Sequence, residues 1–139
     1  MLRFEHNRIV VSISVRCTAE EAWRVLIDTQ YWPHWGPSVA RVSCSQRCIG
    51  SGSSGRIKTS LGFWVPFTIT DYRELQFWSW RIGLIPATGH RLSENDDGTC
   101  SVAFDMPWWA LPYLVVCRIA LSRIKRLLAE PKNNATSAL

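Results

Sequence analysis

The sequence lacks the short motifs that mark hydrolases and nucleotide-binding proteins. It contains no G-x-S-x-G nucleophile elbow, no H-E-x-x-H zinc motif and no glycine-rich loop that could hold a phosphate. Five cysteines are present, but only Cys44 and Cys48 lie close together, and no second Cys or His pair completes a zinc site. We therefore expect no metal ion and no cofactor.

Long apolar runs are also missing. The most apolar stretch, Trp108 to Cys117, contains Pro112 and is followed by Arg118. It is too short for a membrane-spanning helix, which needs about 20 apolar residues, so we expect no stable membrane insertion. The chain does not open with a secretion signal, and we expect a cytoplasmic protein. No recognition helix or aromatic–basic strand motif appears, so we expect no nucleic-acid partner.

Aromatic residues, in contrast, are abundant. The 139 residues include eight tryptophans, and 47% of the chain is hydrophobic, which is enough for a substantial core. We predict a single domain over residues 1–130 and a flexible tail over residues 131–139. The net charge is +5, and the one local concentration of basic residues lies near the C-terminus. These basic residues either lie in solvent at the C-terminal end of a helix or bind anionic lipid headgroups.

Hydrophobic periodicity divides the chain into strands and helices. Residues 9–16 alternate between apolar and polar side chains, which predicts a half-buried strand. Thr18, followed by Glu20 and Glu21, predicts the start of a first helix, and a short second helix is expected within residues 31–36. Alternation then predicts six strands, at residues 39–48, 56–61, 64–72, 77–83, 88–94 and 99–106, with turns at residues 84–87 and 95–98.

Apolar residues three and four positions apart predict a long helix over residues 109–130. The order of elements predicts an α+β fold, with a curved six- to seven-stranded antiparallel sheet wrapped around this helix and two short helices after the first strand. A single helix cannot fill a strongly curved sheet. We therefore expect an apolar cavity between the helix and the sheet.

Several short phrases occur in the order and spacing of a known superfamily. They are AEEAW at residues 19–23, WPHW at 32–35, FWSWR at 77–81 and DGT at 97–99. Together they resemble the START-like (SRPBCC) superfamily, which includes birch-pollen-allergen-like proteins and the polyketide cyclase/dehydrase and lipid-transport family. The resemblance implies a helix-grip fold with a ligand cavity. It implies no particular chemistry, because carriers, sensors, cyclases and hydrolases share this fold.

Strand alternation and the helix stripe predict which side chains line the cavity. A register error of one residue would exchange the two faces of every strand. Trp78 and Trp80 are either core residues or the wall of an aromatic slot, and Trp32 and Trp35 either pack or gate the cavity. The predicted lining consists of Trp32, Trp35, Phe67, Ile69, Trp78, Trp80, His90, Leu92, Phe104, Leu114, Cys117 and Leu121.

Two polar residues are candidates for proton transfer. His90 interrupts an apolar strand face and can titrate near neutral pH, although a lone histidine is more often a hydrogen-bonded core residue. Tyr113, on the long helix, could orient or protonate a ligand oxygen. Asp105 could act as a base only if it turned inward, where its neighbours Phe104 and Met106 are expected.

The leading hypothesis is a monomeric or homodimeric protein that binds a small hydrophobic molecule, such as a lipid, an isoprenoid or an aromatic polyketide. The alternative is a polyketide cyclase or dehydratase that confines its substrate in the cavity and moves protons through His90 or Tyr113. A third hypothesis is a peripheral membrane protein that uses the basic end of the long helix on anionic lipids.

Overall fold

The computed structural model describes residues 2–129 and is an α+β structure. The predicted tail, residues 131–139, lies outside the described residues. The elements are β1 (Leu2–Glu5), β2 (Arg8–Val15), α1 (Ala19–Ile27), α2 (Trp32–Trp35), β3 (Val39–Cys44), β4 (Ser54–Thr59), β5 (Trp64–Arg73), β6 (Phe77–Ile82), β7 (Ile85–Glu94), β8 (Cys100–Pro107), the 3₁₀ helix η1 (Trp108–Tyr113) and α3 (Leu114–Ala129).

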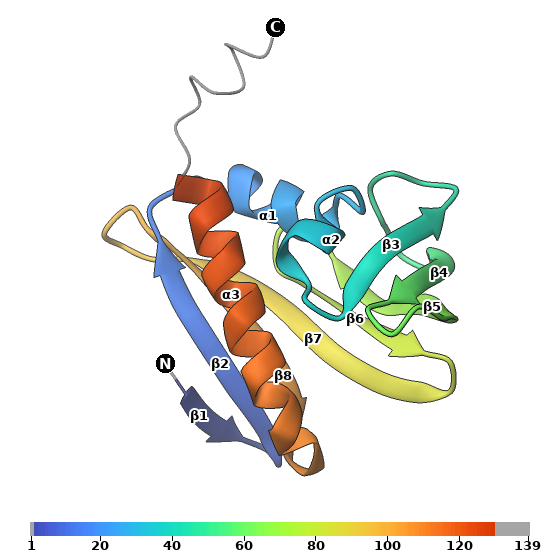
Figure 1. Cartoon of the computed structure of the whole chain (residues 1–139). Helices are drawn as coiled ribbons and strands as arrows, with labels where there is room; N and C mark the ends of the chain where they lie inside the picture. Colours follow the sequence, from blue (N-terminus) through green and yellow to red (C-terminus); the bar gives the residue numbers. More distant parts are fainter. Residues whose placement is uncertain (1, 130–139) are drawn as a thin grey trace, which may run out of the picture.

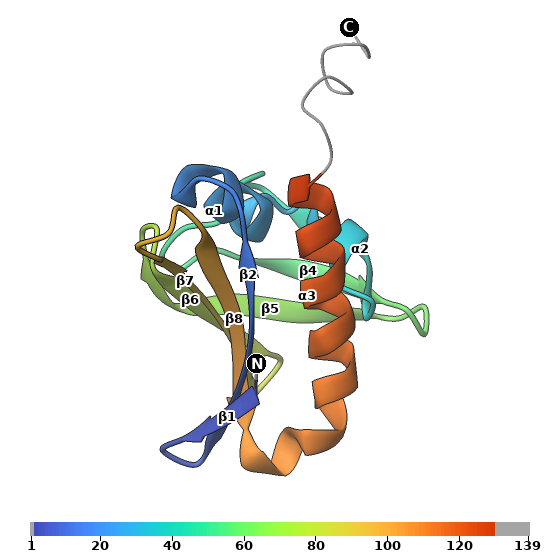
Figure 2. The ribbon, with the colours of Figure 1, turned by 90° about the vertical axis from the view of Figure 1, so that its left-hand side faces the viewer.

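The sheet is antiparallel and wraps around α3, which confirms the predicted helix-grip arrangement. Its eight strands follow the order β1-β2-β8-β7-β6-β5-β4-β3. Figure 1 shows α3 lying across the concave face, with α1 and α2 beside its C-terminal half. In Figure 2, β2 and β8 run along α3 whereas β4 and β5 cross behind it, so the sheet is strongly twisted.

The strand count exceeds the predicted six or seven because β1 pairs with β2. This strand is only four residues long and has no buried face, so its alternation carries little hydrophobic signal. The prediction that β3 runs to residue 48 is wrong, since β3 ends at Cys44. Cys48 instead forms an isolated bridge with Asp28 at the end of α1.

The turn predicted at residues 84–87 is also misplaced. It lies at Gly83 and Leu84, and Gly83 takes the positive φ of 61° that glycine tolerates. Pro86 does not mark the turn; it lies near the start of β7, where the register with β6 shifts. Proline is accepted at such an irregular position because no ladder hydrogen bond depends on its nitrogen.

The predicted long helix is divided in two. The segment from Trp108 to Tyr113 is 3₁₀, and α-helix begins only at Leu114. Pro112 explains the division, since it has no N–H to donate and its ring crowds the preceding turn. As a result, η1 leaves Trp108, Trp109 and Leu111 exposed, while Ala110 packs against the core.

The predicted strand faces are confirmed. Phe67, Trp78, His90 and Phe104 are all at most 2% exposed, and Phe67, Trp78 and Phe104 belong to the same buried core as Leu121 of α3.

Asp105 lies on the opposite face of the sheet, away from α3. Its carboxylate accepts hydrogen bonds from Arg8 Nε at 2.8 Å and Arg91 Nε at 2.9 Å. Gly89 makes room for the carboxylate, because a Cβ there would lie 2.7 Å from the Asp105 oxygens. Asp105 could act as a base in the cavity only if it turned inward, and its side chain points outward instead.

Candidate functional site

Aromatic rings fill most of the space between α3 and the sheet. The indole of Trp32 stacks on Trp78 with ring centroids 5.4 Å apart and makes T-shaped contacts with Phe67 and Trp80. Hydrogen bonds to α1 hold both α2 indoles in place: the N–H of Trp32 donates to the Leu26 carbonyl, and the N–H of Trp35 donates to the Val25 carbonyl. The hollow that remains has a volume of about 30 Å³, which is room for roughly one water molecule.

His90 belongs to this aromatic cluster and is fully hydrogen-bonded. Its ring stacks on Trp78 at a centroid distance of 3.8 Å, and its Nδ1 lies 3.3 Å from the Trp78 carbonyl. Thr88 Oγ1, 3.4 Å from His90 Nε2, accepts a hydrogen bond from Trp80 Nε1 and so has its own hydrogen free for the imidazole. These contacts fit the neutral ring with its proton on Nδ1.

Burial controls the protonation of His90. Loss of water around the ring lowers its pKa from 6.5 to about 4, against smaller opposing effects of the Trp78 carbonyl and of Asp105. At neutral pH the ring is uncharged and is a weak base.

Tyr113 lies at the junction between η1 and α3 and lines the same small hollow as His90. Its hydroxyl is 2.9 Å from Ser38 Oγ, in the segment that joins α2 to β3. Burial raises the pKa of the Tyr113 phenol, and the Ser38 contact opposes this rise. The phenol therefore stays protonated at neutral pH, as a donor or acceptor rather than as an anion.

A larger apolar groove opens beyond Tyr113, at the end of the molecule where η1 meets the sheet. Its volume is about 510 Å³. Trp80 and Tyr113 lie between this groove and the inner hollow, since both residues line both spaces. The walls come from three parts of the chain: the β4–β5 hairpin with Leu61 and Phe63, the start of β7 with Ile85, and η1 with Trp109.

Few polar atoms interrupt the groove lining. The hydroxyl-bearing side chains in its lining are Ser38, Thr59, Ser60, Thr88 and Tyr113. Thr59 Oγ1 is buried and has no hydrogen-bond partner among residues 2–129. A buried hydroxyl without a partner costs about 1–3 kcal/mol, which a ligand oxygen could recover.

The residues predicted to line the cavity fall into separate groups. The inner hollow is lined by Trp32, Trp35, Trp80, His90, Phe104 and Cys117, and Trp80 also lines the groove. Tyr113, predicted as a proton-transfer candidate, lines both spaces. The buried core takes Phe67, Ile69, Trp78, Leu92 and Leu121, with Leu114 half-buried against it. A ligand-binding role for these residues stays a prediction.

Strand alternation could not identify most of the groove residues, because they lie in turns. Leu61, Phe63 and Ile85 flank tight turns, where polar residues are usual, and each is more than half exposed. The sequence feature that could have identified the groove was the presence of large apolar side chains at hairpin turns. They have no place in the core of such a fold, so they point to an exposed apolar surface.

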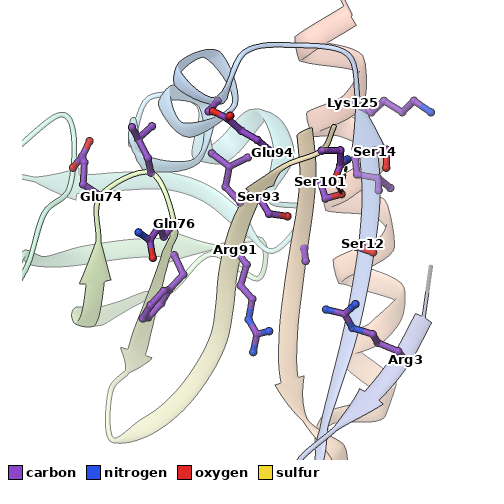
Figure 3. Close-up of a pocket in the computed structure, with 17 residues that line it drawn as sticks. Arg3, Ser12, Ser14, Glu74, Gln76, Arg91, Ser93, Glu94, Ser101 and Lys125 are labelled. Atoms are coloured by element: carbon purple, nitrogen blue, oxygen red, sulfur yellow. Dashed lines mark hydrogen bonds between the residues drawn. The ribbon is translucent and has the colours of Figure 1, made fainter. Parts of the chain in front are cut away.

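The other face of the sheet carries a polar hollow of about 1190 Å³ (Figure 3). Serines from β2, β7 and β8 and the guanidinium of Arg91 project into it, between Glu74 at one edge and Arg3 at the other. Among residues 2–129, no three His, Cys, Asp or Glu side chains are arranged to hold a metal ion. Within the same residues, no helix is long and apolar enough to cross a membrane.

Solved structures of similar proteins share this fold. The chain matches the XoxI protein of Bacillus cereus with a TM-score of 0.68 and 10% identity, over 88% of this chain and 96% of that one. A protein of Nitrosomonas europaea matches with a TM-score of 0.67 and 12% identity, over 98% and 100%. The Aha1 dimer of Colwellia psychrerythraea matches with a TM-score of 0.68 and 14% identity, over 87% and 95%.

These identities show the fold alone, and no curated protein matches the chain. The family model described as polyketide cyclase/dehydrase and lipid transport, however, matches residues 6–131, nearly the full length. The resemblance drawn from the sequence is thereby confirmed, and the chain belongs to this family.

Proposed function

We propose that this protein binds a small hydrophobic molecule in the groove between η1 and the ends of β4, β5 and β7. One observation carries the proposal: the groove holds about 510 Å³ and its walls are almost entirely apolar side chains. This volume lies within the range of about 300–1,000 Å³ that is typical of small-molecule sites. Family membership supports the same class of ligand.

The polar atoms of the groove favour an amphipathic ligand over a pure hydrocarbon. Thr59 offers a buried, unpartnered hydroxyl, and the Ser38–Tyr113 pair offers a second point of contact. A hydroxyl or carbonyl on the ligand could bond to these groups while its apolar body lies against Trp80 and Trp109. Lipids, isoprenoids and aromatic polyketides all combine these features.

Binding can be tested by displacing an anilinonaphthalene sulfonate dye with a long-chain alcohol. We expect wild-type protein to bind both, and Ala110→Phe to weaken both at least tenfold because the added ring enters the groove that Ala110 lines. Ser122→Phe is the matched control, since it adds the same ring at an exposed position on α3. Equal affinities for wild type and Ala110→Phe would contradict the proposal.

Thr59→Val tests the polar contact separately, because it removes one hydroxyl at nearly constant volume. We expect it to weaken the long-chain alcohol by about tenfold, as is usual for one lost hydrogen bond, and to leave the matching hydrocarbon unchanged. Equal effects on the two ligands would show that Thr59 does not contact the ligand oxygen.

Cyclase or dehydratase chemistry remains the alternative function, and the geometry favours it less. His90 faces a hollow of about 30 Å³, has both ring nitrogens engaged and has a pKa of about 4. Tyr113 is the better placed of the two candidates, because it also lines the groove. Turnover of a polyketide substrate that was lost in Tyr113→Phe but kept in Ser38→Ala would favour the enzyme.

A further inference from the structure

Large apolar side chains are exposed at one end of the molecule, which we call the apolar end. It consists of the β1–β2, β4–β5 and β6–β7 turns together with η1. Alternate turns of an antiparallel sheet lie at the same edge, and the Trp108 N–H donates to the Asn7 carbonyl of the β1–β2 turn. Leu84 is 92% exposed, Leu61 84% and Trp108 62%. Figure 1 shows η1 at the foot of the molecule and the β6–β7 turn at its lower right, both far from α1.

The groove opens within this apolar end. Leu61, Phe63, Ile85 and Trp109 are exposed and also line the groove. Leu84 and Trp108 are their neighbours in sequence and line none of the groove. Exposed apolar surface of this extent marks a site of contact with another apolar body.

Carboxylates are distributed unequally between the two ends, whereas cations occur at both. Exposed cations flank the apolar end, at Arg81 beside the β6–β7 turn and at Arg118 in the second turn of α3. The described carboxylates near this end are Glu5 and Asp105, and both are ion-paired with arginines. The opposite end carries Glu20, Glu21, Glu74, Glu94, Asp96 and Asp97.

We propose that the apolar end docks on the surface of an anionic lipid bilayer. Leucine and phenylalanine side chains on turns can reach the acyl region while the turn backbone stays at the hydrated headgroup level, where tryptophan is also favoured. The flanking cations meet anionic headgroups, and the carboxylates at the far end face water. The groove then opens toward the bilayer, from which an apolar ligand could enter without crossing water.

The charge pattern also favours a bilayer over a second copy of the chain. A two-fold dimer through the apolar end would bring like cations toward each other, Arg118 and Arg81 included, with no free carboxylate near to pair with them. This placement differs from a contact through the basic end of α3. Lys125 and Arg126 lie at the C-terminal end of α3, beside α1, far from the exposed turns.

The test is co-sedimentation with vesicles of phosphatidylcholine and phosphatidylglycerol. We expect Leu84→Ser and Trp108→Ser each to lower the partition coefficient about tenfold, since each removes an exposed apolar group. Arg118→Gln should lower it about fivefold, and pure phosphatidylcholine should bind the wild type less. The matched controls are Leu75→Asn, at a turn of the opposite end, and Lys125→Gln; both should bind as wild type does.

Three results would overturn the proposal: no wild-type binding at low salt, loss of binding in Lys125→Gln but not in Leu84→Ser, or a dimer that Leu84→Ser dissociates in ultracentrifugation. Because Leu84 and Trp108 lie outside the groove, their variants should keep the dye affinity of the wild type. Failure of membrane docking is thereby distinguished from failure of ligand binding, which Ala110→Phe reports.

Discussion

The buried imidazole of His90 should make the protein less stable in mild acid. Its pKa is about 4 in the folded protein and close to 6.5 in the unfolded chain. Between these values the unfolded chain binds a proton at this site and the folded protein does not. The free energy of unfolding therefore falls as the pH falls from 6.5 toward 4, and it is unaffected by this group above 6.5.

The size of the effect follows from the shift in pKa. Each pKa unit corresponds to about 1.4 kcal/mol, so a decrease from 6.5 to about 4 corresponds to roughly 3 kcal/mol of stability present at pH 7 and lost by pH 4. For a domain of this size, that is a large part of the total.

Urea unfolding followed by tryptophan fluorescence at a series of pH values would measure this loss. Carboxylates also titrate in this range, so the relevant quantity is the difference between wild type and His90→Gln. Whatever the substitution costs at pH 7, we expect the His90→Gln curve to be flatter by roughly 3 kcal/mol between pH 6.5 and 4. Parallel curves would refute the assignment of a buried, neutral imidazole.

Three further substitutions, and one control, test the packing by urea unfolding. Gly89→Ala places a Cβ 2.7 Å from the Asp105 carboxylate and should cost several kcal/mol, whereas Gly50→Ala, with open space at its Cβ, should cost less than about 1. Trp32→Ala should cost about 3–5 kcal/mol because it opens the aromatic cluster. Asp28→Asn should cost about 2 kcal/mol, since the buried carboxylate accepts hydrogen bonds from Arg47 Nε.

Those parts of the fold that bury one face could be predicted from the sequence. The strand from Cys100 to Met106 has large apolar side chains at every second residue, from Cys100 through Val102 and Phe104, and these side chains predicted which face meets α3. The start of α1 was also predicted from Thr18, and the structure shows this residue as the N-cap, where its hydroxyl accepts a hydrogen bond from the Glu21 backbone N–H. Two errors fell where burial gives no signal, at the exposed strand β1 and at the turn before Ile85. Two others concerned where an element ends: β3 stops at Cys44, and α-helix starts only at Leu114, after Pro112.

The site was harder to predict than the fold. Periodicity shows that Trp78 faces inward, but not whether the opposing Trp32 indole comes close enough to fill the space between them. That outcome depends on the length of the segment after α1 and on the hydrogen bond from Trp32 to Leu26. The unused space therefore lies at the end of the sheet, in a groove lined by residues such as Phe63 and Trp109 from turns and η1.

Quenching of tryptophan fluorescence by a brominated fatty acid tests the central claim most directly, because bromine quenches only indoles that it contacts. Trp109 and Trp80 line the groove, whereas Trp23 is buried elsewhere in the core. We predict saturable quenching in wild type that is reduced in Trp109→Phe and abolished in Ala110→Phe. Quenching that stayed the same in both variants would contradict binding in the groove.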